Sequence, residues 1–325
     1  MTTKKFKATQ QGIVSALFAL LFAGFAAFLP GFAQIDNLLT LVQNVAFLGI
    51  LGLGMAVIVI GRGIDISMIA ALAVPSGLLL QLVQNGHPLG SAFPIALGLA
   101  LAFGLVNGWL IAYAEVPSLF TTLASGLFLA GLGQAYFFQL EVVQWPAALD
   151  PAAWLGRGTL AGVPTPVVMF GVAAAAMAFF LRRMRAGAFV YAIGDNPFAA
   201  RATGLPTRPM VLLQYVLAAL IGLFAGVVMA ASVSSMPTRI FNSTMIYDVV
   251  LVVVLGGIGL SGGRGGVFNV VIGTLLIGTM LNGMTIMDLS YSVQNIVKGV
   301  VLLAAILIDS MLNPRNEETA QQGDI

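Results

Sequence analysis

The chain has 325 residues, of which 59% are hydrophobic and 8% are charged, and its formal net charge is +2. Since a typical soluble domain carries about 25% charged residues, this composition excludes a water-soluble fold. The absence of cysteine excludes disulfides and thiolate metal sites. No basic patch is interleaved with aromatic residues, so nucleic acid is not an expected partner. We also expect no metal and no cofactor.

Apolar runs of about 20 residues recur along the whole chain, and each run is long enough to cross a bilayer. The runs are continuously apolar and lack the alternation of a transmembrane barrel. They predict an all-α polytopic membrane protein with a single transmembrane domain over residues 1–325 and no attached soluble domain. Ten spans are predicted, at residues 11–30, 42–60, 67–84, 91–113, 118–140, 164–181, 210–232, 246–261, 267–286 and 292–312.

The N-terminal segment imitates a signal peptide, because Lys4, Lys5 and Lys7 precede an apolar stretch. That stretch runs from Ile13 to Leu29 and exceeds the usual apolar core of a signal peptide. We therefore predict an uncleaved first span.

The lysines and arginines of the predicted loops set the orientation, because cytoplasmic loops are enriched in both residues. With a cytoplasmic N-terminus, eleven of them lie inside and two lie outside. The eleven are Lys4, Lys5, Lys7, Arg62, Arg182, Arg183, Arg185, Arg201, Arg208, Arg264 and Arg315, and the two are Arg157 and Arg239. We therefore expect both termini and residues 182–209 in the cytoplasm, and residues 141–163 and 233–245 outside.

A Gly-x-Gly segment with a charge pair follows the second span, from Gly61 to Ser67. Arg62 and Asp65 are three positions apart and could form an ion pair that lowers the cost of charge near the bilayer. One interpretation is a cytoplasmic turn with a local ion pair. The other is a broken helix in which Asp65 and Ser67 line a path or a gate.

The polar loop at residues 182–209 contains a predicted short helix with both ends marked. Asn196 or Asp195 is a favourable N-cap, and Pro197 suits the first helical position. Gly204 can adopt the left-handed conformation that ends a helix. Such a short helix is not stable alone and needs a surface to dock against. It is either an interfacial turn on the headgroups or a coupling helix that inserts into a cytoplasmic ATPase.

No segment fits a phosphate-binding loop of the form Gly-x-x-x-x-Gly-Lys-Ser/Thr. The lysines of the chain are Lys4, Lys5, Lys7 and Lys298, and none has this context. The glycine-rich run at residues 262–266 lacks a lysine, and we interpret it as a tight cytoplasmic turn. The chain is therefore not expected to be an enzyme or to hydrolyse ATP.

Three segments resemble the ribose/xylose/galactoside class of ABC sugar permeases. Residues 194–204 read Gly194-Asp195-Asn196-Pro197-Phe198-Ala199-Ala200-Arg201-Ala202-Thr203-Gly204, similar to the coupling-loop pattern Gly-Gly-Asn-x-x-Ala-Ala-Arg-x-Ser-Gly of that class. Residues 63–67 are close to its Gly-Ile-Asp-Leu-Ser, and residues 254–257 and 262–265 match a third segment. The departures are Asp195 for glycine, Thr203 for serine and Met68 for valine.

The resemblance covers residues 42 to 312 and implies a bacterial inner-membrane importer subunit. It implies a fold similar to the vitamin-B12-type importer permease, with about ten helices and a path at a dimer axis. The implied partners are a second permease subunit, a cytoplasmic ATPase that often carries two nucleotide-binding domains, and a periplasmic solute-binding protein. Residues 194–202 and Gly204 would then contact the ATPase.

Polar side chains inside the spans are candidates for contact with the solute, since amides and hydroxyls can hydrogen-bond a sugar. For each of them the alternative is a structural bond between helices. The candidates are Asn44, Asp65, Ser67, Asn107, Thr121, Thr122, Ser125, Gln134, Asn282 and Asn295, with Phe103, Trp109, Tyr136 and Phe137 as stacking surfaces. Lys298 lies inside the last span, so we expect a partner such as Asp288 or Asp248, or a snorkelling route outward.

Two alternatives to a sugar importer remain open at the level of sequence. One is an ion-coupled secondary transporter, although its few acids, such as Asp65 and Asp309, lie near the ends of spans. The other is an ABC permease for a nucleoside, a branched-chain amino acid or a furanose signal.

Overall fold

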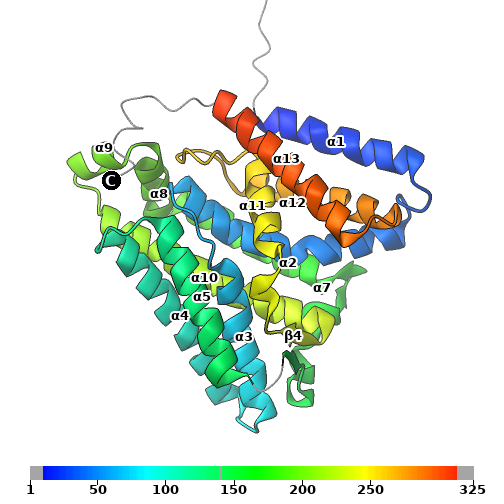
Figure 1. Cartoon of the computed structure of the whole chain (residues 1–325), viewed down its shortest axis with the longest axis horizontal. Helices are drawn as coiled ribbons and strands as arrows, with labels where there is room; N and C mark the ends of the chain where they lie inside the picture. The colour runs from blue at the N-terminus through cyan, green and yellow to red at the C-terminus, as the bar shows by residue number, and fades with distance from the viewer. Residues whose placement is uncertain (1–9, 139–140, 313–325) are drawn as a thin grey trace, which may run out of the picture.

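A computed structural model describes residues 10–138 and 141–312, and helices lie at each predicted span (Figure 1). These helices are α1 (Gln10–Phe28), α2 (Ile35–Ile60), α3 (Met68–Gln84), α4 (Leu89–Ala112), α5 (Ser118–Leu132), α7 (Thr165–Arg183), α10 (Thr207–Val233), α11 (Met245–Leu255), α12 (Val267–Ile286) and α13 (Tyr291–Leu312). Lys4, Lys5, Lys7 and Arg315, which enter the charge count, lie outside the described residues.

Seven of the described helices are long and apolar enough to cross a membrane. They are α2, α4, α7, α10, α12, α13, and α5 together with the π-helical turn η1 (Gly133–Phe137). Helices α1, α3 and α11 contain shorter apolar segments. At 11 residues, α11 is also shorter than the predicted span 246–261. It ends at Leu255 because Gly257 turns the chain with a φ of 87°.

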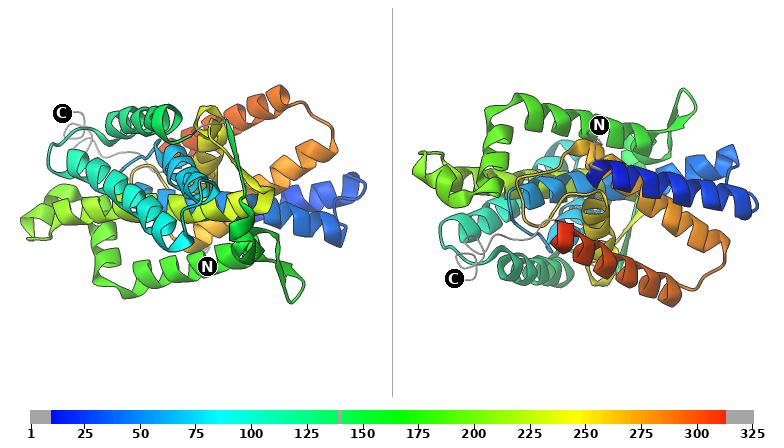
Figure 2. Two further views of the ribbon diagram at one scale, coloured as in Figure 1. Left: turned by 90° about the horizontal axis from the view of Figure 1, so that it is seen from below. Right: turned by 90° about the horizontal axis from the view of Figure 1, so that it is seen from above.

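Helix α2 lies at the centre of the molecule, and 83% of its most apolar stretch of 18 residues is buried. Helices α7, α10, α11 and α12 pack around it. Figure 2 shows α7 on one side of this central layer and α5 and α13 on the other. Helix α10 can approach α3 closely because Gly226 faces α3, where an added Cβ would lie 2.3 Å from the Leu72 carbonyl oxygen.

Two small antiparallel pairs order the segments predicted to lie outside the membrane. Strand β1 (Val142–Gln144) pairs with β4 (Ser235–Pro237), and β2 (Thr159–Leu160) pairs with β3 (Val163–Pro164). The short helical turns η2 (Ala147–Ala152), α6 (Trp154–Arg157) and η3 (Ile240–Asn242) complete this region. The β1–β4 pairing buries Val143 against Met236 and joins the connections at residues 141–163 and 233–245.

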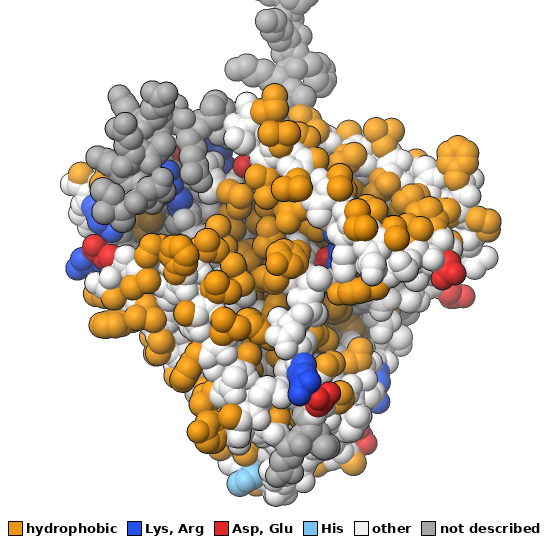
Figure 3. All heavy atoms as spheres, viewed as in Figure 1, with side chains coloured by type: hydrophobic (Ala, Val, Ile, Leu, Met, Phe, Trp, Pro, Cys, Tyr) orange, Lys and Arg blue, Asp and Glu red, His pale blue; other side chains and the backbone are white. Residues whose placement is uncertain are grey.

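Much of the surface is apolar, as expected for side chains that face lipid. Figure 3 shows orange side chains over much of the visible face, with few blue and red ones, most of them along its edges and in its lower part. Large side chains such as Phe128 on α5 and Leu303 on α13 are about 70% exposed in the isolated chain. An apolar surface of this extent requires a bilayer or a partner to cover it.

Candidate functional site

The predicted polar loop at residues 182–209 is largely helical. It forms α8 (Arg185–Asp195), which was not predicted, and α9 (Pro197–Ala202), which is the predicted short helix. The Asn196 side-chain oxygen accepts hydrogen bonds from the backbone N–H groups of Phe198 and Ala199, both at 3.0 Å. Gly204 has a φ of 78° and ends the element. Asn196, rather than Asp195, is therefore the N-cap.

The outward face of α9 is apolar although it is exposed. Phe198 is 49% exposed, and Ala199 and Ala202 beside it are exposed as well. Ala200 is buried on the opposite side, and Arg201 is exposed. Such an exposed apolar face is covered either by lipid or by a protein partner.

The end of α8 packs backbone to backbone on two other segments. A Cβ added at Gly194 would lie 1.8 Å from the Ile60 carbonyl oxygen, at the end of α2. That same oxygen accepts a hydrogen bond of 2.8 Å from the N–H of Gly263. The Tyr191 hydroxyl donates to the Gly265 carbonyl oxygen at 2.8 Å. The glycine-rich run is thus a turn, as predicted, and it packs against α8 and α2.

A buried polar cluster lies between α2 and α3. The Asp65 carboxylate accepts hydrogen bonds from the Ser67 N–H at 2.8 Å and from the Ser67 hydroxyl. The Asn107 amide donates to the Ser67 hydroxyl at 3.1 Å, and the Thr122 hydroxyl accepts from the N–H of Ile66 at 3.1 Å. Burial raises the pKa of the Asp65 carboxyl to about 6, while the bonds from Ser67 act in the opposite direction.

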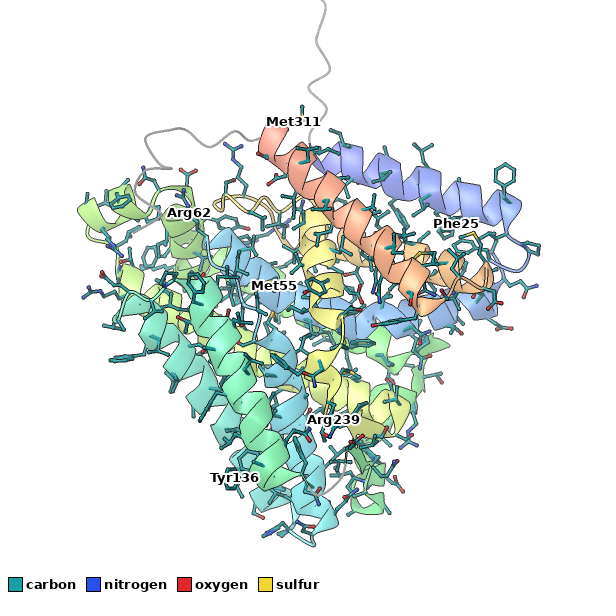
Figure 4. All side chains as sticks on the ribbon, viewed as in Figure 1. Phe25, Met55, Arg62, Tyr136, Arg239 and Met311 are labelled. Atoms are coloured by element: carbon teal, nitrogen blue, oxygen red, sulfur yellow. The ribbon has the colours of Figure 1, made fainter. Side chains whose placement is uncertain are left out.

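The predicted ion pair between Arg62 and Asp65 does not form. Asp65 is engaged with Ser67, and Arg62 adopts a φ of 70°, which turns its side chain away into a separate cavity. Figure 4 shows Arg62 near α8, toward the opposite end of the molecule from Arg239.

A second group of predicted residues lines a large cavity at the other end of α2. The cavity has a volume of about 690 Å³ and is bordered by α2, α11, α12 and the start of α13. Asn44 and Asn282 both line it. Asn282 exchanges two hydrogen bonds of 3.0 Å with Asn37, which also lines the cavity.

A buried ion pair borders this cavity. The Lys298 ammonium lies 2.8 Å from the Asp248 carboxylate, which confirms Asp248, and not Asp288, as the partner. The ammonium also lies 5.9 Å from the centre of the Tyr291 ring and donates to the Thr244 hydroxyl at 3.4 Å. The hydroxyls of Thr244 and Tyr291 are 2.8 Å apart, and Asn295 accepts from Thr244 at 3.3 Å.

The remaining predicted residues lie apart from the large cavity. Thr121 is buried on α5, and Gln134 lies in η1 with its amide nitrogen buried. Ser125 donates a local hydrogen bond to the Thr122 carbonyl oxygen. Phe103 is packed in the core, whereas Trp109 and Tyr136 are exposed on the outside of the bundle. None of the four aromatic candidates lines the large cavity.

Asn37, Thr244 and Tyr291 line the cavity but were not predicted. All three lie just outside the predicted spans, and α2 begins seven residues before the span predicted at 42–60. Thr244 and Tyr291 had a signal in the sequence, because they directly precede the predicted spans that carry Asp248 and Lys298. Asn37 precedes a span without charged residues and had no such signal.

Comparisons with known proteins find permease proteins. A family model described as the permease component of branched-chain amino acid transport systems matches residues 34–306. The chain is 32% identical over 310 residues to the ribose import permease protein of Escherichia coli (strain K12), covering 95% of each chain. It is 32% identical over 294 residues to the ribose import permease protein of Bacillus subtilis (strain 168), covering 86% of each.

A third relative carries a different solute in its name. The galactofuranose transporter permease protein of Escherichia coli (strain K12) is 30% identical over 270 residues, which cover 83% of this chain and 78% of the relative. No solved structure matches the chain.

Proposed function

Because the chain belongs to the family of permease components of branched-chain amino acid transport systems, we propose that it is the membrane-spanning subunit of an ATP-driven, binding-protein-dependent importer. Its proposed partners are a cytoplasmic ATP-binding subunit, a periplasmic solute-binding protein and a second permease subunit. The proposal includes ten membrane spans in a fold of the vitamin-B12-type importer class. The solute is a monosaccharide or a related small polyol, in keeping with the names of the relatives.

The observation that carries the proposal is α9, a capped helix of six residues with an exposed apolar face. An ion-coupled carrier has no need of such a helix, whereas an importer without its own phosphate-binding loop has to dock on an external motor. Residues 194–202 and Gly204 form the proposed contact with the ATPase. The backbone packing of Gly194 on Ile60 connects this contact to α2.

The proposed orientation places α9 and both termini in the cytoplasm of a bacterium, with the protein in the inner membrane. The charge count of the predicted loops favours this orientation. In Figure 1 the start of α1, the end of α13 and α9 lie along the upper edge of the molecule. This arrangement is compatible with placing both termini and α9 on one side of the membrane. The large cavity then faces the periplasmic half of the membrane, where a binding protein delivers solute.

The chemistry of the large cavity favours a neutral, polyhydroxylated solute. Its polar groups are amides and hydroxyls, contributed by Asn37, Asn44, Asn282 and Thr244. Among the described residues that line it, the one carboxylate belongs to Asp248 and is already paired with Lys298 at 2.8 Å. We assign Asn44 and Asn282 to the solute path. Asp65, Ser67, Asn107, Thr121, Thr122 and Gln134 stay as proposals for the same path, further along the bundle.

Reconstitution in proteoliposomes tests the function directly. The permease, its ATPase and its binding protein are incorporated, and uptake of radiolabelled ribose and galactofuranose is measured. Accumulation is expected to require ATP on the α9 side and binding protein on the other side, and to persist with a protonophore. Accumulation driven by a proton or sodium gradient without ATP contradicts the proposal. Uptake of leucine without uptake of either sugar would support the ATP-driven importer and refute the proposed sugar solute.

A matched pair of variants tests the docking role of α9. Ala199→Arg places a charge on the exposed apolar face, whereas Arg183→Gln alters an exposed residue of α7 that lies outside α9. The first variant is expected to lose co-purification with the ATPase at unchanged membrane abundance, and the second is expected to keep it. Normal co-purification and uptake in the first variant would remove α9 as the motor contact.

A further inference from the structure

A second, smaller cavity lies beside α9 and has no role in the proposed transport path. Its volume is about 240 Å³, and it is bordered by the end of α2, the α4–α5 turn, α9 and the start of α10. Three arginines line it: Arg62, Arg201 and Arg208. They come from segments far apart in the sequence, so the fold itself brings them together.

The cavity carries an excess of positive charge. Arg208 forms an ion pair of 3.0 Å with Glu115, and both side chains are largely exposed. Among the residues that the structure describes, no carboxylate lies within ion-pair distance of Arg62 or Arg201. Within the described part of the chain, these two guanidinium groups have no counter-charge, and guanidinium groups match the geometry of phosphate and carboxylate oxygens.

A buried donor in the same cavity also lacks an acceptor. Gln214 on α10 lines the cavity, is 2% exposed, and packs against Gly61. Its side-chain nitrogen has no hydrogen-bond partner among the described residues. A buried donor without an acceptor destabilises the fold, so its presence points to an acceptor that binds there. An oxyanion supplies that acceptor and the missing counter-charge together.

The position of the cavity indicates where the anion comes from. Trp109 and Tyr113 lie at the end of α4 beside the cavity and are exposed, and the Arg208 guanidinium lies 5.7 Å from the centre of the Tyr113 ring. Tryptophan and tyrosine are enriched at the level of the lipid headgroups. Phe120, in the first turn of α5, is 64% exposed and continues this lipid-facing surface. The cavity therefore opens at headgroup height.

We propose that this cavity binds the phosphate of an anionic phospholipid from the cytoplasmic leaflet. Arg62 and Arg201 hold the phosphate oxygens, and the Gln214 amide donates to one of them. Basic pockets between membrane helices on this side are suited to such headgroups. The volume lies below the range of about 300–1,000 Å³ that encloses larger organic ligands, which disfavours a nucleotide. The proposal rests on the cytoplasmic placement of α9.

A bound phosphate would join the coupling helix to the bundle. Arg201 belongs to α9, Arg62 follows α2, and Gln214 belongs to α10. One anion would therefore connect three elements, and it would offset the repulsion between the guanidinium groups of Arg62 and Arg201.

Native mass spectrometry of the purified full-length permease tests the proposal. Delipidated protein is titrated with phosphatidylglycerol and, separately, with phosphatidylcholine, in the absence of ATPase and transport. Phosphatidylglycerol is expected to bind, and Arg62→Gln/Arg201→Gln is expected to weaken its binding about tenfold or more, because each arginine near the membrane surface contributes on the order of 1 kcal/mol. Arg183→Gln, an exposed arginine outside the cavity, is the control and is expected to bind as the wild type does.

Three results would overturn the proposal. The first is equal binding of phosphatidylglycerol and phosphatidylcholine by the wild type. The second is unchanged phosphatidylglycerol binding in the double variant. The third is a loss of phosphatidylglycerol binding in Arg183→Gln as large as that in the double variant. Protection from thermal unfolding by inorganic phosphate alone, without any by phosphatidylglycerol, would replace the lipid by a soluble anion. If the double variant does not elute as a folded peak, the two single variants are measured instead. Normal transport without lipid binding would refute this site and leave the proposed function intact.

Discussion

The buried Lys298–Asp248 pair is a strong test of the packing around the large cavity. The ammonium and carboxylate are 2.8 Å apart, and their side chains are 6% and 13% exposed. Lys298→Met keeps most of the side-chain length but removes the charge. The Asp248 carboxylate is then left buried without a counter-charge, and Thr244 loses its ammonium donor.

The expected cost is large because one charge remains uncompensated. Removing one partner of a buried pair destabilises a protein by about 3–5 kcal/mol. At about 2 °C of midpoint shift per kcal/mol for a large chain, this corresponds to roughly 6–10 °C. Lys298→Met/Asp248→Leu removes both charges and is expected to recover most of the loss, since an apolar pair of similar volume is often neutral.

Scanning fluorimetry in detergent measures the unfolding midpoint of each variant. The control is Glu141→Gln, which breaks the Arg239–Glu141 pair at a similar distance of 2.9 Å but with side chains 63% and 67% exposed. An exposed pair contributes about 0–1 kcal/mol, so the control should shift the midpoint by at most about 2 °C. A shift in Lys298→Met no larger than that of the control would refute the reasoning. A double variant as unstable as the single one would do the same.

Four further predictions concern the coupling segment, the polar cluster and the topology. Asn196→Ala removes both cap bonds, costs α9 about 1 kcal/mol, and should weaken co-purification with the ATPase, whereas Asn196→Asp should preserve it. Gly194→Ala forces a Cβ to 1.8 Å from a carbonyl oxygen and should lower folded yield in size-exclusion chromatography, with a normal yield contradicting the close packing. The fold raises the pKa of the Asp65 carboxyl from 3.8 to about 6 and so favours its neutral form. The free energy of unfolding should therefore fall as the pH rises from about 4 to about 6. Asp65→Asn should flatten this dependence when the thermal unfolding midpoint is measured across that range. With an impermeant thiol reagent on intact cells, Ala148→Cys should be labelled and Ala320→Cys, outside the described residues, should not; the reverse pattern would invert the topology.

The helices at the ten predicted spans were predictable because each has to bury or expose a continuous apolar run, which the sequence displays directly. The end of α11 was not, since the run continues to Leu260 while the backbone turns at Gly257. The cap of α9 was predictable because Asn196 bonds to its immediate neighbours. The Asn37–Asn282 bonds join residues 245 positions apart, and such a pairing leaves no local signal. The same holds for the cavity formed by Arg62, Arg201 and Arg208, whose members converge only in the folded chain.

The contact of Gly194 with Ile60 has a mechanical consequence. Helix α2 has 26 residues, no proline and no described break, so it behaves as a stiff rod of about 39 Å. At Ile60 no side chain separates α2 from α8, because only a glycine fits between the two backbones. A displacement of α8 would therefore be transmitted directly to α2. Asn44 lies in the other half of the same helix and lines the large cavity. A small tilt of α2 at Ile60 would therefore move Asn44 and, with it, one wall of this cavity.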